Sequence, residues 1–72
     1  MADDTFVIAD GPYPRQNFDG DEVPYWVVFV SDDSGEPIGK VYQCASRDKA
    51  IDLGEKMSKD RGLHFENETS YA

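Results

Sequence analysis

A single run of six apolar or aromatic residues stands out in the hydrophobic pattern of the chain. It covers residues 25–30 and reads Tyr-Trp-Val-Val-Phe-Val. The run is too short to span a membrane. Its aromatic and β-branched composition, between Pro24 and the turn-forming residues 32–35, is typical of a β-strand. We therefore expect this strand to lie at the centre of the core.

Both faces of this strand are apolar. Every second side chain of a strand shares a face, so the pattern does not tell which of two apolar faces is buried. One helix covers one face, and the other needs residues 10–23, the C-terminal tail or another copy of the protein. The two faces consist of Tyr25, Val27 and Phe29 on one side and Trp26, Val28 and Val30 on the other.

A second strand is expected at residues 38–44, paired with residues 25–31 as a β-hairpin. The intervening Asp and Ser residues favour the start of a turn, and Gly35 supplies the positive φ that a longer hairpin turn requires. Shorter apolar runs predict two further short strands, near residues 5–9 and near residues 63–66.

Residues 46–61 have the pattern of an amphipathic helix. Ser46 is a suitable N-cap, and Gly62 is placed to end the helix in the left-handed conformation. Glycine in mid-helix costs up to about 1 kcal/mol relative to alanine, so Gly54 predicts a close approach to the sheet, beneath an aromatic ring of residues 25–30. The apolar side of the helix consists of Ala50, Ile51, Leu53, Gly54 and Met57.

The remaining segments are polar or rich in turn-forming residues. We expect a glycine- and proline-rich loop at residues 10–23 and mobile ends at residues 1–4 and 67–72. The elements together predict a single small domain over residues 1–72. Its class is α+β with two layers, in which a small, mainly antiparallel sheet packs on one helix.

The composition adds a strong negative charge. Fifteen acidic residues against seven basic ones give a net charge of −8. Residues 1–24 carry six acids and one base, whereas residues 47–62 carry five bases and four acids. An acidic surface repels phosphate groups, so we expect neither direct nucleic-acid binding nor binding to anionic membranes. Three roles for this charge are open. It can keep the protein soluble, attract a basic protein partner, or imitate a nucleic acid.

The cysteine count and the N-terminal sequence bear on the compartment. Cys44 is the only cysteine, which excludes an internal disulfide and a cysteine-rich metal site. The sequence Met-Ala-Asp-Asp lacks the basic start and the apolar segment of a signal peptide. We therefore expect a cytoplasmic protein.

Candidates for chemistry are few. An enzyme that uses Cys44 and His64 is one hypothesis, because Cys44 precedes the expected helix N-terminus, which lowers thiol pKa values. However, a lone cysteine after an apolar strand is most often a packing residue, and strand alternation would turn His64 toward solvent. The acidic clusters at residues 17–22 and 32–36 lack the spacing of a calcium loop. We expect no enzyme activity, no metal and no cofactor.

The leading hypothesis is a small acidic protein-binding module without catalytic activity. It acts through an apolar and aromatic sheet face or edge that is rimmed by acidic loops. The partner is a protein, either a basic one or a second copy of the chain. The alternative is an acidic inhibitor that imitates nucleic acid, which requires carboxylates in one surface row. The interface residues expected are Tyr25, Trp26, Tyr42, Asp19, Asp21 and Glu22.

Overall fold

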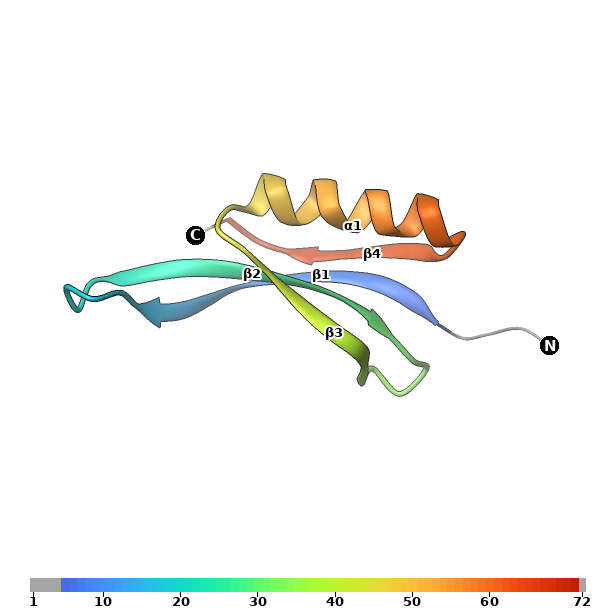
Figure 1. Ribbon diagram of the computed structural model, residues 1–72, viewed down its shortest axis with the longest axis horizontal. Helices are drawn as coiled ribbons and strands as arrows, with labels where there is room; N and C mark the ends of the chain where they lie inside the picture. The colour runs from blue at the N-terminus through green and yellow to red at the C-terminus, as the bar shows by residue number, and fades with distance from the viewer. Residues whose placement is uncertain (1–4, 72) are drawn as a thin grey trace.

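The computed structural model describes residues 5–71, which form a four-stranded sheet with one helix on one of its faces (Figure 1). The elements in chain order are β1 (Phe6–Gln16), β2 (Glu22–Ser31), β3 (Pro37–Cys44), α1 (Arg47–Arg61) and β4 (His64–Thr69). The strand order in the sheet is β3-β2-β1-β4. The predicted α+β class is confirmed. Two of the three strand pairings are antiparallel, and the third, between β1 and β4, is parallel, so the sheet is mixed.

The core lies between α1 and one face of the sheet. Trp26, Val28 and Val30 point toward the helix and are only 5%, 0% and 8% exposed. The alternation predicted for residues 25–30 is therefore confirmed, and the structure identifies which of the two apolar sets is buried. The core is completed by Val7 and Ala9 of β1 and by Ala50 of α1.

The helix begins and ends at the predicted caps. The Ser46 hydroxyl accepts a hydrogen bond of 3.2 Å from the backbone N–H of Lys49, which satisfies one of the free donors of the first turn. Gly62 has the left-handed angles φ 67° and ψ 33°, and its N–H donates to the Ser58 carbonyl. This conformation favours glycine and ends the helix so that the chain can turn back into β4.

Gly54 allows a close approach of α1 to the sheet, but the facing ring is not the one predicted. A Cβ atom at position 54 would lie 2.3 Å from Cε1 of Phe65. The expectation that the ring belongs to residues 25–30 is wrong, because Phe65 of β4 fills this place. Strand β4 lies next to β1 in the sheet, and this pairing could not be read from the local sequence.

The predicted loop at residues 10–23 is instead most of a long β-hairpin. Strand β1 continues to Gln16 and β2 starts at Glu22, so the turn between them is limited to residues 17–21. Residues 12–25 pair with neither β3 nor β4 and project beyond the start of α1 as a two-stranded extension (Figure 1). We call residues 12–25 the arm. It contributes to the longest dimension of the molecule, 49 Å.

The prolines of the arm do not interrupt its strand pairing, because they occupy positions where no N–H donor is needed. Pro14 lies directly opposite Pro24, and neither residue has an N–H to exchange. Antiparallel pairs alternate between hydrogen-bonded and non-hydrogen-bonded positions, so this pair occupies a non-bonded position and removes no bond from the ladder. The missing donors would have pointed outward, and their absence protects both edges of the arm from pairing with a further strand.

The C-terminal segment is also more structured than predicted. Strand β4 pairs with β1 through Thr69 rather than ending at residue 66, and Ser70 N–H donates a 2.9 Å hydrogen bond to the Gly11 carbonyl. The Ser70 carbonyl accepts a 3.0 Å hydrogen bond from the indole N–H of Trp26. Ser70 makes both bonds through its backbone groups, which is why the polar side chains of residues 67–70 did not predict them. Residues 1–4 and residue 72 lie outside the described residues.

Candidate protein-binding face

The sheet face opposite α1 is apolar, and within residues 5–71 no helix or strand lies over it. Its side chains come from the strand positions that alternate with the buried ones, and Ile8 lies directly across from Phe29 in the β1–β2 register. Most of them are half-buried against one another, and Val41 of β3 is 42% exposed. We call this surface the open face; it consists of Phe6, Ile8, Tyr25, Val27, Phe29 and Val41.

Tyrosine and polar side chains extend the open face along the arm, and their contacts hold the arm in place. The Tyr13 and Tyr25 rings lie with centroids 5.8 Å apart, and the Arg15 guanidinium lies 5.2 Å from the Tyr25 ring. Arg15 also donates a 2.9 Å hydrogen bond to the side chain of Gln43 on β3. The hydrogen bond from the Tyr13 hydroxyl to the Asp10 carboxylate raises the pKa of Tyr13. The contacts with Tyr25 lie within the arm, and the hydrogen bonds from Arg15 to Gln43 and from Tyr13 to Asp10 join the arm to the main sheet.

The end of the arm is a tight turn with an acidic rim. The Asn17 side-chain oxygen accepts hydrogen bonds from the backbone N–H groups of Asp19 and Asp21, both at 3.0 Å. Phe18 is fully exposed at this turn, beside acidic side chains that are exposed as well. On the arm itself, an open hollow of about 340 Å³ is lined by Pro12, Tyr13, Pro14, Glu22 and Pro24.

The turn between β2 and β3 carries the second acidic group. The Asp32 carboxylate accepts hydrogen bonds from the Ser34 hydroxyl (2.6 Å) and from the backbone N–H groups of Ser34 (2.9 Å) and Glu36 (3.1 Å). The bond from the Ser34 hydroxyl is the largest cause that lowers the pKa of Asp32, and the Glu36 N–H adds to it. The Asp32 carboxylate therefore stabilises the turn through these hydrogen bonds.

Replacing Ser34 by alanine is expected to raise the pKa of Asp32 toward the ordinary aspartate value of about 3.9. In the wild-type protein the lowered pKa means that the stabilisation from ionised Asp32 is complete above that ordinary value and is lost as the pH falls through the folded pKa. An NMR titration of the Asp32 carboxyl carbon measures this shift. Ser70→Ala serves as the control, and an unchanged Asp32 pKa in Ser34→Ala would contradict the assignment.

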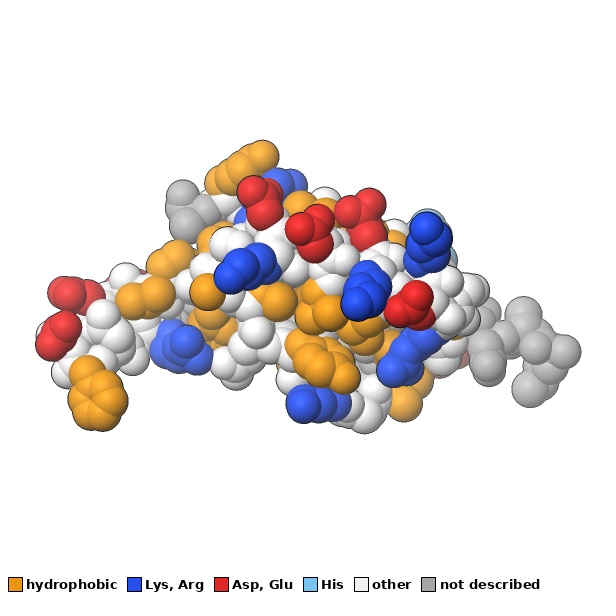
Figure 2. All heavy atoms as spheres, turned by 45° about the horizontal axis from the view of Figure 1, so that its top comes forward, with side chains coloured by type: hydrophobic (Ala, Val, Ile, Leu, Met, Phe, Trp, Pro, Cys, Tyr) orange, Lys and Arg blue, Asp and Glu red, His pale blue; other side chains and the backbone are white. Residues whose placement is uncertain are grey.

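Negative charge is concentrated in the layer that carries the open face. Helix α1 has five basic and four acidic residues, a net charge of +1. The described residues outside α1 have nine acidic residues and two basic ones, a net charge of −7. Figure 2 shows basic and acidic side chains interleaved over the helix. The sequence pattern could not assign these charges to faces, because the assignment depends on the sheet topology.

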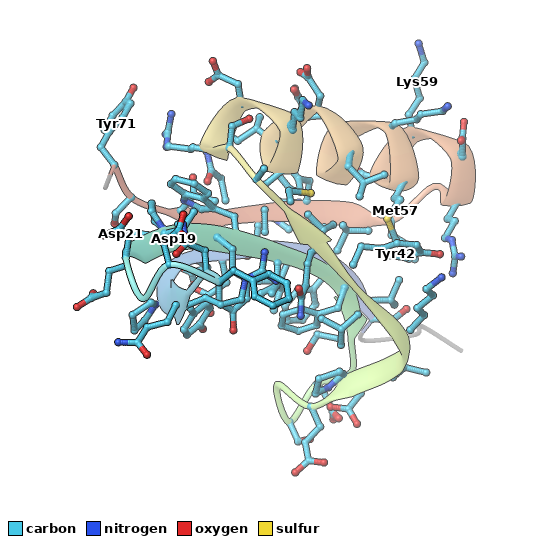
Figure 3. The ribbon with its side chains drawn as sticks, turned by 60° about the vertical axis from the view of Figure 1, so that its left-hand side comes forward. Asp19, Asp21, Tyr42, Met57, Lys59 and Tyr71 are labelled. Atoms are coloured by element: carbon cyan, nitrogen blue, oxygen red, sulfur yellow. The ribbon has the colours of Figure 1, made fainter. Side chains whose placement is uncertain are left out.

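The predicted aromatic anchors fall on two different faces. Trp26 is buried beneath α1, and Tyr42 points toward the helix near Met57 (Figure 3). Of the three, Tyr25 alone belongs to the open face, and Trp26 is not exposed, so it does not meet the condition for an anchor. Asp19 and Asp21 lie in the arm turn, exposed as expected, with Glu22 beside them at the start of β2 (Figure 3). The prediction did not include the other five residues of the open face. Alternation had placed Val27 and Phe29 beside Tyr25, whereas Phe6, Ile8 and Val41 reach this face only through the strand register.

The structure does not bring Cys44 and His64 together. Cys44 ends β3 at one edge of the sheet and packs against the core, whereas His64 begins β4 at the opposite edge. Three strand spacings separate the edges, a distance of about 14 Å. Burial raises the pKa of the Cys44 thiol, and the charge of Lys49 offsets part of this rise. His64 Nε2 lies 3.3 Å from Glu66 on the exposed side of β4.

The two acidic turns lie at opposite ends of β2. Asp19 and Asp21 precede the strand and Asp32 and Asp33 follow it, so ten residues, or about 33 Å of strand, separate the clusters. This separation does not provide one continuous row of carboxylates. Within residues 5–71, no group of three or more His, Cys, Asp or Glu side chains is arranged to hold a metal ion.

Comparisons with family models, curated protein sequences and solved structures find no match for this chain. The described part of the chain also contains no helix that is long and apolar enough to cross a membrane.

Proposed function

We propose that the protein is a small binding module without catalytic activity, and that its open face docks a basic protein partner. The observation that carries the proposal is that an uncovered apolar sheet face lies in the layer with a net charge of −7. Contiguous apolar patches of this kind on small proteins mark interaction sites. The acidic turns around the patch would speed the approach of a positively charged partner.

The apolar part of the face supplies affinity in this proposal. Phe29 and Ile8 lie directly opposite each other at its centre, and Val27 is the next residue of the same face along β2. Burial of apolar surface contributes roughly 25 cal/mol per Å², so covering these side chains would be favourable. Aromatic side chains such as Phe29 and Tyr25 are the kind that dominate protein interfaces.

The charge favours a basic partner over the other candidates. A second copy of the chain would bring two surfaces of like charge together, against a net charge of −8 on each copy. A nucleic-acid imitator would need its carboxylates in one row, and the two acidic turns are separated by the length of β2. A basic protein surface complements both the acidic rim and the apolar centre.

Replacement of Phe29 by threonine is expected to abolish capture of the partner from a lysate of the source cells. Threonine keeps the β-branched character that strands favour while removing the aromatic ring. Ile38→Thr is the matched control, because Ile38 is an exposed apolar residue of β3 outside the open face. Captured proteins are identified by mass spectrometry, and binding should weaken steadily as salt is raised. Equal capture by Phe29→Thr and wild type, or salt-independent capture, would overturn the proposal.

A further inference from the structure

We propose that the occupant of the open face is an amphipathic α-helix of the partner, with an apolar stripe along β1 and β2 and with lysine or arginine residues on the flank above β4. This inference rests on the proposed function and specifies the partner more closely. It combines three properties of the face: its dimensions, the protection of the strand edges and the one-sided placement of its acidic residues.

The dimensions of the sheet suit one helix on each face. Helix α1 has 15 residues, about 22 Å, and covers the buried face of the same strands. The open face presents apolar side chains from β1, β2 and β3, whose outer axes are about 10 Å apart. A helix is about 10–12 Å wide with its side chains. A second helix on the open face would complete a three-layer arrangement.

The edges of the sheet disfavour an added strand. Strand β3 starts at Pro37, and its pairing with β2 is interrupted by a bulge between Val28 and Val30. Strand β4 is six residues long and carries two glutamates, and the arm has prolines on both of its strands. Short edges, bulges, charges and prolines all oppose pairing with another chain. A partner segment therefore gains more by lying across the face than by extending the sheet.

The acidic residues of the face lie on one side of it. In the β1–β4 register, Glu66 is the partner of Ile8 and Glu68 is the partner of Asp10. Phe65 points to α1, so alternation turns both glutamates toward the open face. On the opposite side, β3 contributes the uncharged residues Val41 and Gln43. A helix seated between these sides would place its basic residues over β4.

Helix α1 of a second copy is not a suitable occupant. Its apolar side already contacts its own sheet through Ala50, Leu53 and Met57. Its exposed side carries both signs of charge and few apolar residues. The occupant must therefore come from a chain with a helix whose apolar stripe is free.

The test uses the full-length protein and a labelled model peptide of about 14 residues, composed of leucine and lysine and patterned to give one apolar stripe when helical. Binding is measured by fluorescence anisotropy at several salt concentrations. The stripe peptide is expected to bind. A scrambled peptide of the same composition and a leucine–glutamate peptide with the same pattern are expected to bind at least tenfold more weakly. Phe29→Thr should remove most of the binding.

The double variant Glu66→Gln/Glu68→Gln is expected to weaken binding of the stripe peptide by about five- to tenfold and to reduce its dependence on salt. Asp52→Asn/Glu55→Gln is the matched control, because it changes the net charge equally on the exposed side of α1. This control should change the affinity less than twofold. Circular dichroism verifies that each variant is folded.

Four results would overturn the inference: a stripe peptide that does not bind, scrambled and striped peptides that bind equally, an equal effect of the two charge variants, or no effect of Phe29→Thr on peptide binding. The result also separates this inference from the proposed function. If Phe29→Thr abolishes capture of the natural partner while the stripe peptide does not bind, the open face is the binding site and the occupant is not a helix.

Discussion

Replacement of Trp26 by alanine is expected to lower the free energy of unfolding by about 3–5 kcal/mol, the range for removal of a large aromatic side chain from a core. The indole is 5% exposed between the sheet and α1, and its N–H is bonded to the Ser70 carbonyl. A domain of this length has a stability of roughly 4–11 kcal/mol. The variant should therefore lose a large part of its stability, which urea unfolding followed by far-ultraviolet circular dichroism measures.

Tyr25→Ala is the control for this prediction. The two aromatic residues are adjacent in β2 but face opposite sides, and Tyr25 is half-exposed beside Tyr13 and Arg15. Its removal leaves no closed cavity, so we expect a loss of about 1 kcal/mol, as for an aromatic pair at a partly exposed site. Equal losses for the two variants would show that the open face is covered in solution or that α1 does not cover Trp26.

The contrast between these neighbours shows what the sequence of β2 predicts and what it leaves open. Alternation identifies the two sets of residues 25–30 correctly, because the side-chain period of a strand is a local property. It does not choose between them, since both sets are apolar. The choice depends on which side α1 packs against, and this follows from the connection of β3 to β4 across the whole sheet.

The arm shows a different limit. Its glycines and prolines predict a loop, because each weakens a strand when considered alone. Pairing of Pro14 with Pro24 removes this penalty, since two residues without N–H groups face each other at a non-bonded position. Such compensation requires the partner residue to be known. A single segment does not reveal it.

The candidate site has both predictable and unpredictable parts. Two apolar faces and one helix predicted that the second face needs a further cover, but not what the cover is, and the acidic turns followed from Asp19, Asp21 and Asp32. Alternation grouped Tyr25, Val27 and Phe29 on one face, but Ile8 and Val41 did not follow, because they come from neighbouring strands that only the register brings to this face. Trp26 was a candidate anchor only if exposed, and it is buried because α1 packs on its side of the sheet. Local composition predicts whether a surface is apolar or acidic. Which residues together form that surface depends on the sheet topology.

The register of β4 places Phe65 against Gly54 of α1, so a substitution at position 54 should have a second large effect on stability, opposite in sign to the one that helix propensity predicts. Gly54→Ala is expected to destabilise the protein by about 1–2 kcal/mol. In an isolated helix the change would gain up to about 1 kcal/mol. Here the new Cβ would lie 2.3 Å from Phe65 Cε1 and 2.9 Å from Cζ, and relief of this overlap requires the ring or the helix to move. Overpacking of this kind costs about 1–3 kcal/mol, which exceeds the gain.

A double-mutant cycle with Phe65→Leu tests whether the overlap is the cause. Leucine at position 65 makes room beside residue 54, so alanine should be tolerated there or even stabilise the helix. The coupling energy between the two sites should be at least about 1 kcal/mol, within the range for residues in contact. Urea unfolding of the wild type, both single variants and the double variant measures it. Additive effects would indicate that Phe65 does not press on Gly54, and a stabilising Gly54→Ala would place α1 farther from β4.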